Sequence, residues 1–107
     1  MIDKESLLNR CVGEEELMRE LLQDFLDRCE GERQALLGAR DEIGPQAHRI
    51  KGLALNLSME PLREKAAQLE KRVANGDNRS QALEELLTTL SATCEEARAI
   101  LHGERDG

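Results

Sequence analysis

Aromatic residues are almost absent from this chain of 107 residues, which has one phenylalanine and no tryptophan or tyrosine. The core must therefore be built from Leu, Ile, Val, Met and Ala, a set that contains several strong helix formers. No stretch alternates apolar and polar residues with period two, and no segment is enriched in β-branched residues as strands are. We predict an all-α fold.

Long apolar runs and an excess of positive charge are missing as well. No uninterrupted apolar segment approaches the roughly 20 residues that a membrane helix needs. The first residues, Met1–Glu5, do not form the basic-then-apolar pattern of a signal peptide. A net charge of −7 repels phosphate backbones and anionic lipids. We therefore expect a soluble, cytoplasmic protein with neither nucleic acid nor membrane as a partner.

The three cysteines, Cys11, Cys29 and Cys94, are odd in number and show no CxxC spacing. This pattern indicates neither a disulfide framework nor a zinc site. Cys29 and Cys94 each fall on an apolar stripe, where a free cysteine behaves as a small hydrophobic residue. We expect reduced thiols packed in the core.

Two prolines and a small number of glycines divide the chain into helical segments. The first long helix is expected over about 14–38 and the second over about 45–57, beginning at Pro45. Ser58 and Pro61 are start signals for a third, which Asn75-Gly76 ends, and Asp77 or Ser80 caps the last. A short helix around 6–9 precedes them, with Leu7 and Leu8 covering the bundle. We expect residues 1–107 to form one domain, with its core at about 6–101 and a frayed tail at 103–107.

Each long segment carries an apolar stripe with helical spacing, which predicts an antiparallel four-helix bundle. The expected stripes are Leu17, Leu21, Phe25 and Cys29; Ala47, Ile50, Ala54 and Leu57; Leu62, Ala66, Leu69 and Val73; and Leu83, Leu87, Leu90, Cys94, Ala97 and Leu101. In the second helix, His48, Lys51, Gly52 and Leu55 face away from the stripe. The unusual chemistry of the chain lies on that outward face.

Residues 47–59 read AHRIKGLALNLSM, with an Ala-His pair, an apolar residue two after the histidine, and Lys-Gly at three and four after it. This segment resembles the phosphoacceptor signature of histidine phosphotransfer domains, and the resemblance extends over roughly residues 6–101. Two departures are visible. Ser58 stands where the family usually has glycine, and Gly44-Pro45 is expected to shorten the active helix at its start.

Each residue of the signature also has a physical reason. The imidazole of His48 is a competent nucleophile near pH 7 when neutral. Lys51, one turn later on the same face, can offset the charge of a phosphoryl group. Glycine inside a helix costs about 1 kcal/mol, so Gly52 suggests that a partner approaches the backbone closely there. With Pro45 as the first helical residue, His48 would lie near the positive end of the helix dipole.

The resemblance implies roles for further residues. Glu70 matches a family position beside the phosphorylated imidazole, where it could orient the ring through a hydrogen bond. Leu55, on the same exposed stripe as His48, is expected to contact the partner, and we also assign Arg49 to the partner-binding surface.

The resemblance implies a phosphocarrier and not an autonomous enzyme. His48 would accept a phosphoryl group from a receiver-domain aspartate, or from a kinase, and pass it to another receiver of a two-component phosphorelay. The partners would be response-regulator receivers, hybrid sensor histidine kinases, or both. Mg²⁺ would come with the receiver, and this chain would hold no cofactor or metal. We expect a monomer.

Several other functions compete with this interpretation. A histidine kinase dimerisation helix usually has an acidic residue after its histidine and a proline soon afterwards, whereas Arg49 follows here, and the chain has no Gly-rich nucleotide-binding segment. A helical-bundle metal site would need Glu-x-x-His pairs, which are missing. His102 has no functional neighbours and is expected to be inert. The alternative that stays open is a bundle that binds receivers or kinases without accepting phosphate.

Overall fold

The computed structural model describes residues 2–106, and the side chains of residues 2–103. The described chain contains no strand, which confirms the all-α prediction. Throughout this range, every helix is too short or too polar to span a lipid bilayer. The helices are α1 (Lys4–Arg10), α2 (Glu15–Leu37), α3 (Ile43–Asn56), α4 (Glu60–Ala74) and α5 (Ser80–Asp106), and a 3₁₀ turn (Arg40–Glu42) precedes α3.

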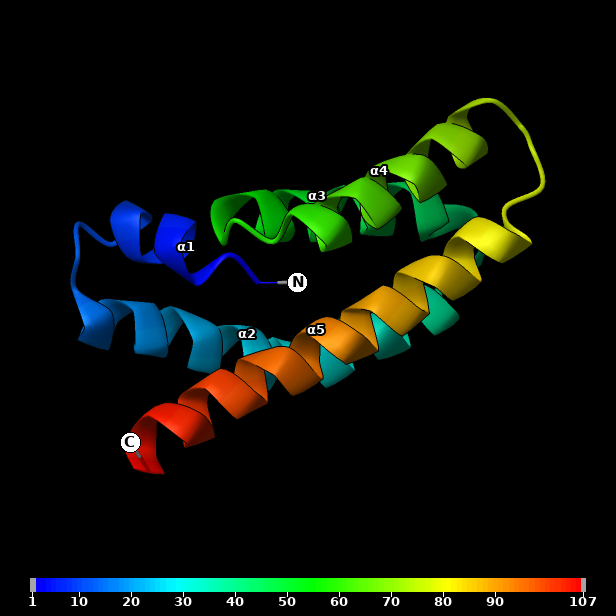
Figure 1. Ribbon diagram of the computed structural model, residues 1–107. Helices are drawn as coiled ribbons and strands as arrows, with labels where there is room; N and C mark the ends of the chain where they lie inside the picture. Colours follow the sequence, from blue (N-terminus) through cyan, green and yellow to red (C-terminus); the bar gives the residue numbers. More distant parts are fainter. Residues whose placement is uncertain (1, 107) are drawn as a thin grey trace.

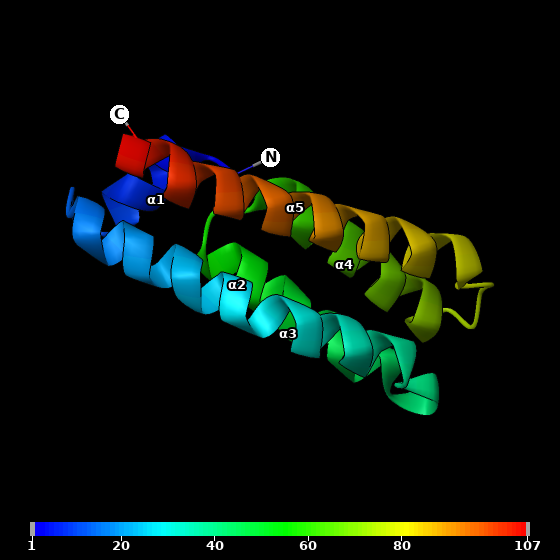
Figure 2. The ribbon, with the colours of Figure 1, turned by 90° about the horizontal axis from the view of Figure 1, so that it is seen from below.

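Helices α2 to α5 form an antiparallel bundle in two layers, with α3 beside α4 and α2 beside α5 (Figures 1 and 2). The bundle is elongated, with extents of 47 × 22 × 17 Å. The short helix α1 lies at the end of the bundle where α2 begins and α5 ends (Figure 1). In α1, Leu7 is buried and Leu8 is half-buried. The predicted bundle with an additional N-terminal helix is therefore confirmed.

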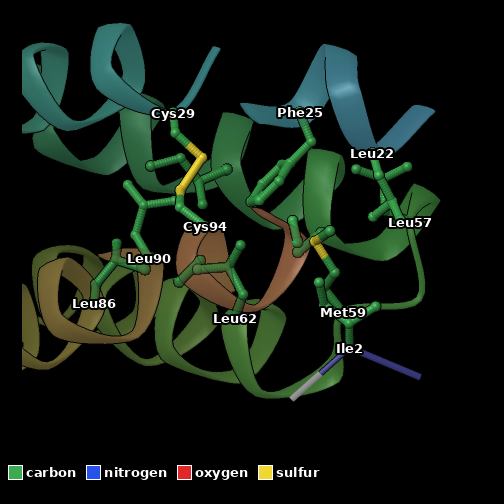
Figure 3. Close-up of a cluster of buried hydrophobic side chains, with 14 of the residues drawn as sticks. Ile2, Leu22, Phe25, Cys29, Leu57, Met59, Leu62, Leu86, Leu90 and Cys94 are labelled. Atoms are coloured by element: carbon green, nitrogen blue, oxygen red, sulfur yellow. A yellow bond between two sulfur atoms is a disulfide. The ribbon is translucent and has the colours of Figure 1, made fainter. Parts of the chain in front are cut away.

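The core is filled by side chains from all the long helices (Figure 3). Phe25 of α2 points inward toward residues of α4 and α5, and Met59 lies beside Ile2 at the edge of the cluster (Figure 3). The predicted stripe of α3 is buried at all of its positions: Ala47, Ile50, Ala54 and Leu57. On α4, Leu62, Ala66 and Leu69 are buried and Val73 is half-buried.

The predicted face of α2 is wrong in its first two turns. Leu17 is 38% exposed and Leu21 is half-buried, whereas Met18 and Leu22 are fully buried. The predicted positions are four residues apart at every step, and because a helical turn has 3.6 residues, such a row drifts by about 40° per step around the helix. Met18, Leu22, Phe25 and Cys29 alternate steps of four and three, which keeps them on one face.

The stripe of α5 was predicted correctly in its second half, where Leu90, Cys94, Ala97 and Leu101 are buried. In the first half, Leu86 is the buried residue, and the predicted Leu83 and Leu87 are half-buried at the edges of the same face. The expected tail, 103–107, is helical as far as Asp106, and Gly107 lies outside the described residues.

A disulfide joins Cys29 of α2 to Cys94 of α5 across the core (Figure 3). It links positions that are 65 residues apart in the sequence, and Cys11 is a buried free thiol. The expectation of reduced thiols was therefore wrong for this pair. The two cysteines do lie in the core as predicted, but facing each other from adjacent helices.

Candidate functional site

The helix that carries His48 begins earlier than predicted. It starts at Ile43, so that Gly44 and Pro45 lie within its first turn, where the missing N–H of proline leaves no hydrogen bond unmade. Gly44 lies against α4, where an added Cβ would come within 3.2 Å of Val73 Cγ1. The expected shortening of the helix is thus wrong. His48 is the sixth residue of α3, beyond the first turn in which the helix dipole acts, so the dipole argument does not apply to it.

The end of the same helix explains the second departure from the family signature. Ser58 has φ +57°, a left-handed conformation that glycine adopts without cost. The N–H of Met59 bonds to the carbonyl of Ala54 at 2.9 Å and the N–H of Ser58 to that of Leu55 at 3.3 Å, which is the Schellman arrangement of a helix C-terminus. The Ser58 hydroxyl accepts a hydrogen bond from Arg10 Nε at 2.7 Å. The turn keeps the geometry that a glycine would give it.

His48 is bound by a carboxylate of the neighbouring helix. Its Nδ1 lies 2.7 Å from Oε2 of Glu70 on α4, while the side chain as a whole is 67% exposed. The other oxygen of Glu70, Oε1, lies 2.6 Å from Nζ of Lys51. The structure therefore brings together three of the predicted site residues, with Glu70 between the imidazole and the ammonium.

This arrangement selects one tautomer of the imidazole. An ionised carboxylate can only accept hydrogen bonds, so Nδ1 of His48 is the donor. In the neutral ring Nε2 then carries the lone pair. The hydrogen bond from Lys51, together with that from His48, lowers the pKa of the Glu70 carboxyl and keeps it ionised, although partial burial opposes this. The site presents a nucleophilic nitrogen on the bundle surface.

The neighbouring positions leave the approach to Nε2 open. A Cβ added to Gly52 would meet nothing within 4 Å, so nothing inside the chain requires glycine at this helical position. Leu55, one turn further along α3, is 53% exposed. The surface at Gly52 is therefore open, and Leu55 presents an apolar side chain to solvent.

Arg49 lies on the other side of this face and bonds to a residue that sequence reasoning missed. Its Nε donates to Oε1 of Glu32 on α2 at 3.1 Å, and Nε2 of Gln46 donates to Oε2 of the same carboxylate at 2.6 Å. Glu32 is buried. The signal that could have identified it is a charged residue three positions after Cys29 on the apolar stripe of α2.

The grooves on the surface lie away from this site. Two of them lie between α2 and α5, one between α4 and α5 and one on α5 alone, with volumes of about 320 to 350 Å³, and none of these four is lined by His48, Lys51 or Glu70. Over residues 2–103 no group of three or more His, Cys, Asp or Glu side chains is placed to hold a metal ion. His48 is thus an exposed side chain that lines none of these four grooves.

Comparison with known proteins identifies one family. The family model described as Hpt domain matches residues 16–100, a range that includes α3, α4 and all but the first residue of α2, with all the residues of the site. No curated protein and no solved structure matches the chain.

Proposed function

Because the chain belongs to the Hpt domain family, whose members are phosphocarrier modules of two-component signalling, we propose that it carries a phosphoryl group on Nε2 of His48. It accepts the group from the phosphorylated aspartate of a receiver domain, or from a kinase, and passes it to another receiver. The observation that carries this proposal is the 2.7 Å contact between His48 Nδ1 and Glu70, which leaves Nε2 as the ring nitrogen that the carboxylate does not engage, on a side chain that is mostly exposed.

The transfer follows from the geometry of the site. The lone pair of Nε2 attacks the phosphorus atom, a P–N bond forms, and the bond from phosphorus to the aspartate oxygen breaks, so that the aspartate leaves as a carboxylate. The imidazole becomes positively charged while it keeps its proton on Nδ1. Glu70, which accepts that proton in a hydrogen bond, offsets the charge.

Lys51 supplies a positive charge for the phosphoryl group. Its ammonium is held by Glu70 in the unphosphorylated chain, one turn from His48 on the same helix face. When the phosphoryl group arrives, the flexible side chain of Lys51 can turn toward the phosphoryl oxygens and stabilise their negative charge. Glu70 thus holds this cation close to the reacting nitrogen before transfer begins.

We propose that Mg²⁺ comes with the receiver and not with this chain. Among residues 2–103, the carboxylate paired with His48 is that of Glu70, and both of its oxygens are already engaged, by His48 and Lys51. A hard divalent cation prefers several oxygen ligands in an octahedral arrangement. Residues of this chain therefore supply the nucleophile and its orientation, and the chain by itself is no kinase.

The proposed partners are receiver domains and hybrid sensor kinases. We further propose that the chain acts as a monomer, since one bundle with one exposed imidazole is sufficient for transfer. We also propose a cytoplasmic location, where the Cys29–Cys94 disulfide would be exposed to reduction. A net charge of −7 supports the exclusion of nucleic acid.

The experiment that tests this function compares the wild type with His48→Gln and His102→Gln. Each purified chain is incubated with Mg²⁺ and a panel of receivers carrying labelled aspartyl phosphate. We expect acid-labile, base-stable label on the wild type and on His102→Gln, because His102 is exposed on α5 and is paired with no carboxylate among residues 2–103. We expect none on His48→Gln. Receivers that bind all three chains and label none would instead support the module that binds without accepting phosphate.

A further inference from the structure

Glu32 is a carboxylate on a packing face that is otherwise almost entirely apolar. It lies on α2 between the buried residues Cys29 and Leu36, and its side chain is 8% exposed. Both oxygens are used, by Gln46 at 2.6 Å and by Arg49 at 3.1 Å, and both of these donors come from α3. Withdrawal of an ionised carboxylate from water is costly, and an apolar residue of similar size often stabilises a fold as well or better. Contact between the helices alone is thus a weak reason for a glutamate at this position.

Arg49, the hydrogen-bond partner of Glu32, is not buried. The side chain of Arg49 is 67% exposed, although its Nε is fixed by Glu32. A guanidinium has five N–H donors, and Nε supplies one of them. No further hydrogen bond of Arg49 is found among residues 2–103. Its four terminal N–H groups therefore remain for a partner, held in a fixed plane by the bond at Nε.

Arg49 and His48 are held on either side of the outward face of α3. His48 is held toward α4 by Glu70, and Arg49 is held toward α2 by Glu32. Successive helical residues are about 100° apart, and a residue four later than His48 lies about 40° from it, so Gly52 falls between the two directions. The outward face of α3 is thus an open glycine position between a fixed imidazole and a fixed guanidinium.

We propose that Glu32 is a positioning residue, which holds the Arg49 guanidinium where it binds an anionic oxygen of the docked receiver. The oxygen is that of a carboxylate or of the phosphoryl group. This inference rests on the proposed function and extends it from the nucleophile to the recognition of the partner.

The direction in which Glu32→Gln changes receiver affinity distinguishes a positioning role of Glu32 from a purely electrostatic one. Glu32→Gln removes a negative charge near the docking face, so a purely electrostatic role predicts tighter binding of an anionic partner. The positioning role predicts weaker binding, because a neutral amide holds the guanidinium less firmly. We expect the dissociation constant to rise about fivefold for Glu32→Gln and about tenfold for Arg49→Ala.

The experiment is a double-mutant cycle on the full chain. Receiver affinity is measured for the wild type, Glu32→Gln, Arg49→Ala and the double variant, with Mg²⁺, with and without beryllofluoride on the receiver. We expect the double variant to bind no more weakly than Arg49→Ala. A loss of affinity that is confined to the beryllofluoride form of the receiver would show that Arg49 binds a phosphoryl oxygen. An equal loss with both forms would show that Arg49 binds a receiver carboxylate. In parallel, the Nε–H signal of Arg49 in NMR spectra should be protected in the wild type and lose its protection in Glu32→Gln.

Two control variants separate this role from simple stability. Gln46→Ala removes the other hydrogen bond of Glu32 but leaves Arg49 bound, so it should lower the melting temperature without changing receiver affinity. Arg98→Ala removes a half-exposed arginine of α5, which lines grooves on the α2–α5 face, and should also leave the affinity unchanged.

Two kinds of failure are distinguishable. A wild type that accepts phosphate, together with a Glu32→Gln variant that binds as tightly or more tightly, overturns the positioning role alone. Additive effects of Glu32→Gln and Arg49→Ala on receiver affinity would also overturn the positioning role. So would a loss of affinity in Gln46→Ala equal to that in Glu32→Gln. A wild type that neither binds receivers nor accepts phosphate from them overturns the proposed function, and this inference with it.

Discussion

Oε2 of Glu70 lies 2.7 Å from Nδ1 of His48, so the orientation of the exposed imidazole is set by a residue from the next helix. The two residues are 22 positions apart in the sequence, and the packing of α3 on α4 brings them together. The imidazole of His48 therefore depends on the bundle for its tautomer as well as for its place on the surface.

Replacement of Glu70 by alanine should slow phosphoryl uptake by His48 by a factor of about ten or more, because the ring loses its fixed tautomer and its charge compensation. The rate is measured with a labelled receiver, and NMR of the imidazole nitrogens should show that Nδ1 no longer carries the proton predominantly. Glu64→Ala, at an exposed position of the same helix, is the matched control and should react like the wild type. A Glu70→Ala variant with an altered tautomer and an unchanged rate would contradict the role of Glu70.

The same carboxylate should make stability depend on pH. Hydrogen bonds from Lys51 and His48 lower the pKa of Glu70 below its ordinary value of 4.5 in the folded chain. The folded state therefore binds this proton less readily than the unfolded state, and the resulting stabilisation is complete above the unfolded value. It is lost as the pH falls through the lower folded value. The difference in melting temperature between the wild type and Glu70→Gln should be constant near neutral pH and shrink from about pH 5 downward. A difference that persists undiminished at pH 3 would argue against an ionised Glu70.

The residues around His48 were the most predictable part of the molecule. The alternating spacing of Ala47, Ile50, Ala54 and Leu57 fixes the buried face of α3, and the outward direction of His48 follows from it. The face of α2 was harder to predict, because apolar residues at 17, 18, 21 and 22 fit two overlapping rows. Which row is buried depends on the neighbouring helices.

Two contacts lay beyond what spacing could predict. The pairing of Cys29 with Cys94 requires the two stripes to meet in register, and nothing in the cysteine count indicates this. The contact between Glu32 and Arg49 likewise joins separate helices, and an acidic residue on an apolar stripe indicates only that some partner must exist. Local periodicity thus predicts the helices, whereas the side-chain contacts between helices depend on tertiary packing.

Gly52 should respond to substitution with opposite effects on stability and function. Gly52→Ala adds a methyl group that meets nothing within 4 Å in the free chain, so it should stabilise the fold by up to about 1 kcal/mol. The same methyl group would obstruct a docked receiver and slow transfer. Gly31→Ala, inside α2 and equally free of contacts, should stabilise similarly without affecting transfer. Denaturant unfolding and transfer rates check both effects, and equal transfer rates in the two variants would remove the reason given for Gly52.

The disulfide should contribute strongly to stability while leaving the phosphoryl chemistry unchanged. A cross-link that closes a loop of 65 residues reduces the entropy of the unfolded chain, which corresponds to about 4 kcal/mol at 25 °C. Dithiothreitol should therefore lower the denaturant midpoint of the wild type but not that of a Cys29→Ser/Cys94→Ser variant, which should unfold at a midpoint close to that of the reduced wild type. Phosphoryl uptake at 25 °C should be the same with and without reductant, because the bond joins α2 to α5 while His48 and Glu70 lie on α3 and α4. A midpoint that does not respond to dithiothreitol would mean that the two thiols pack together without a covalent bond.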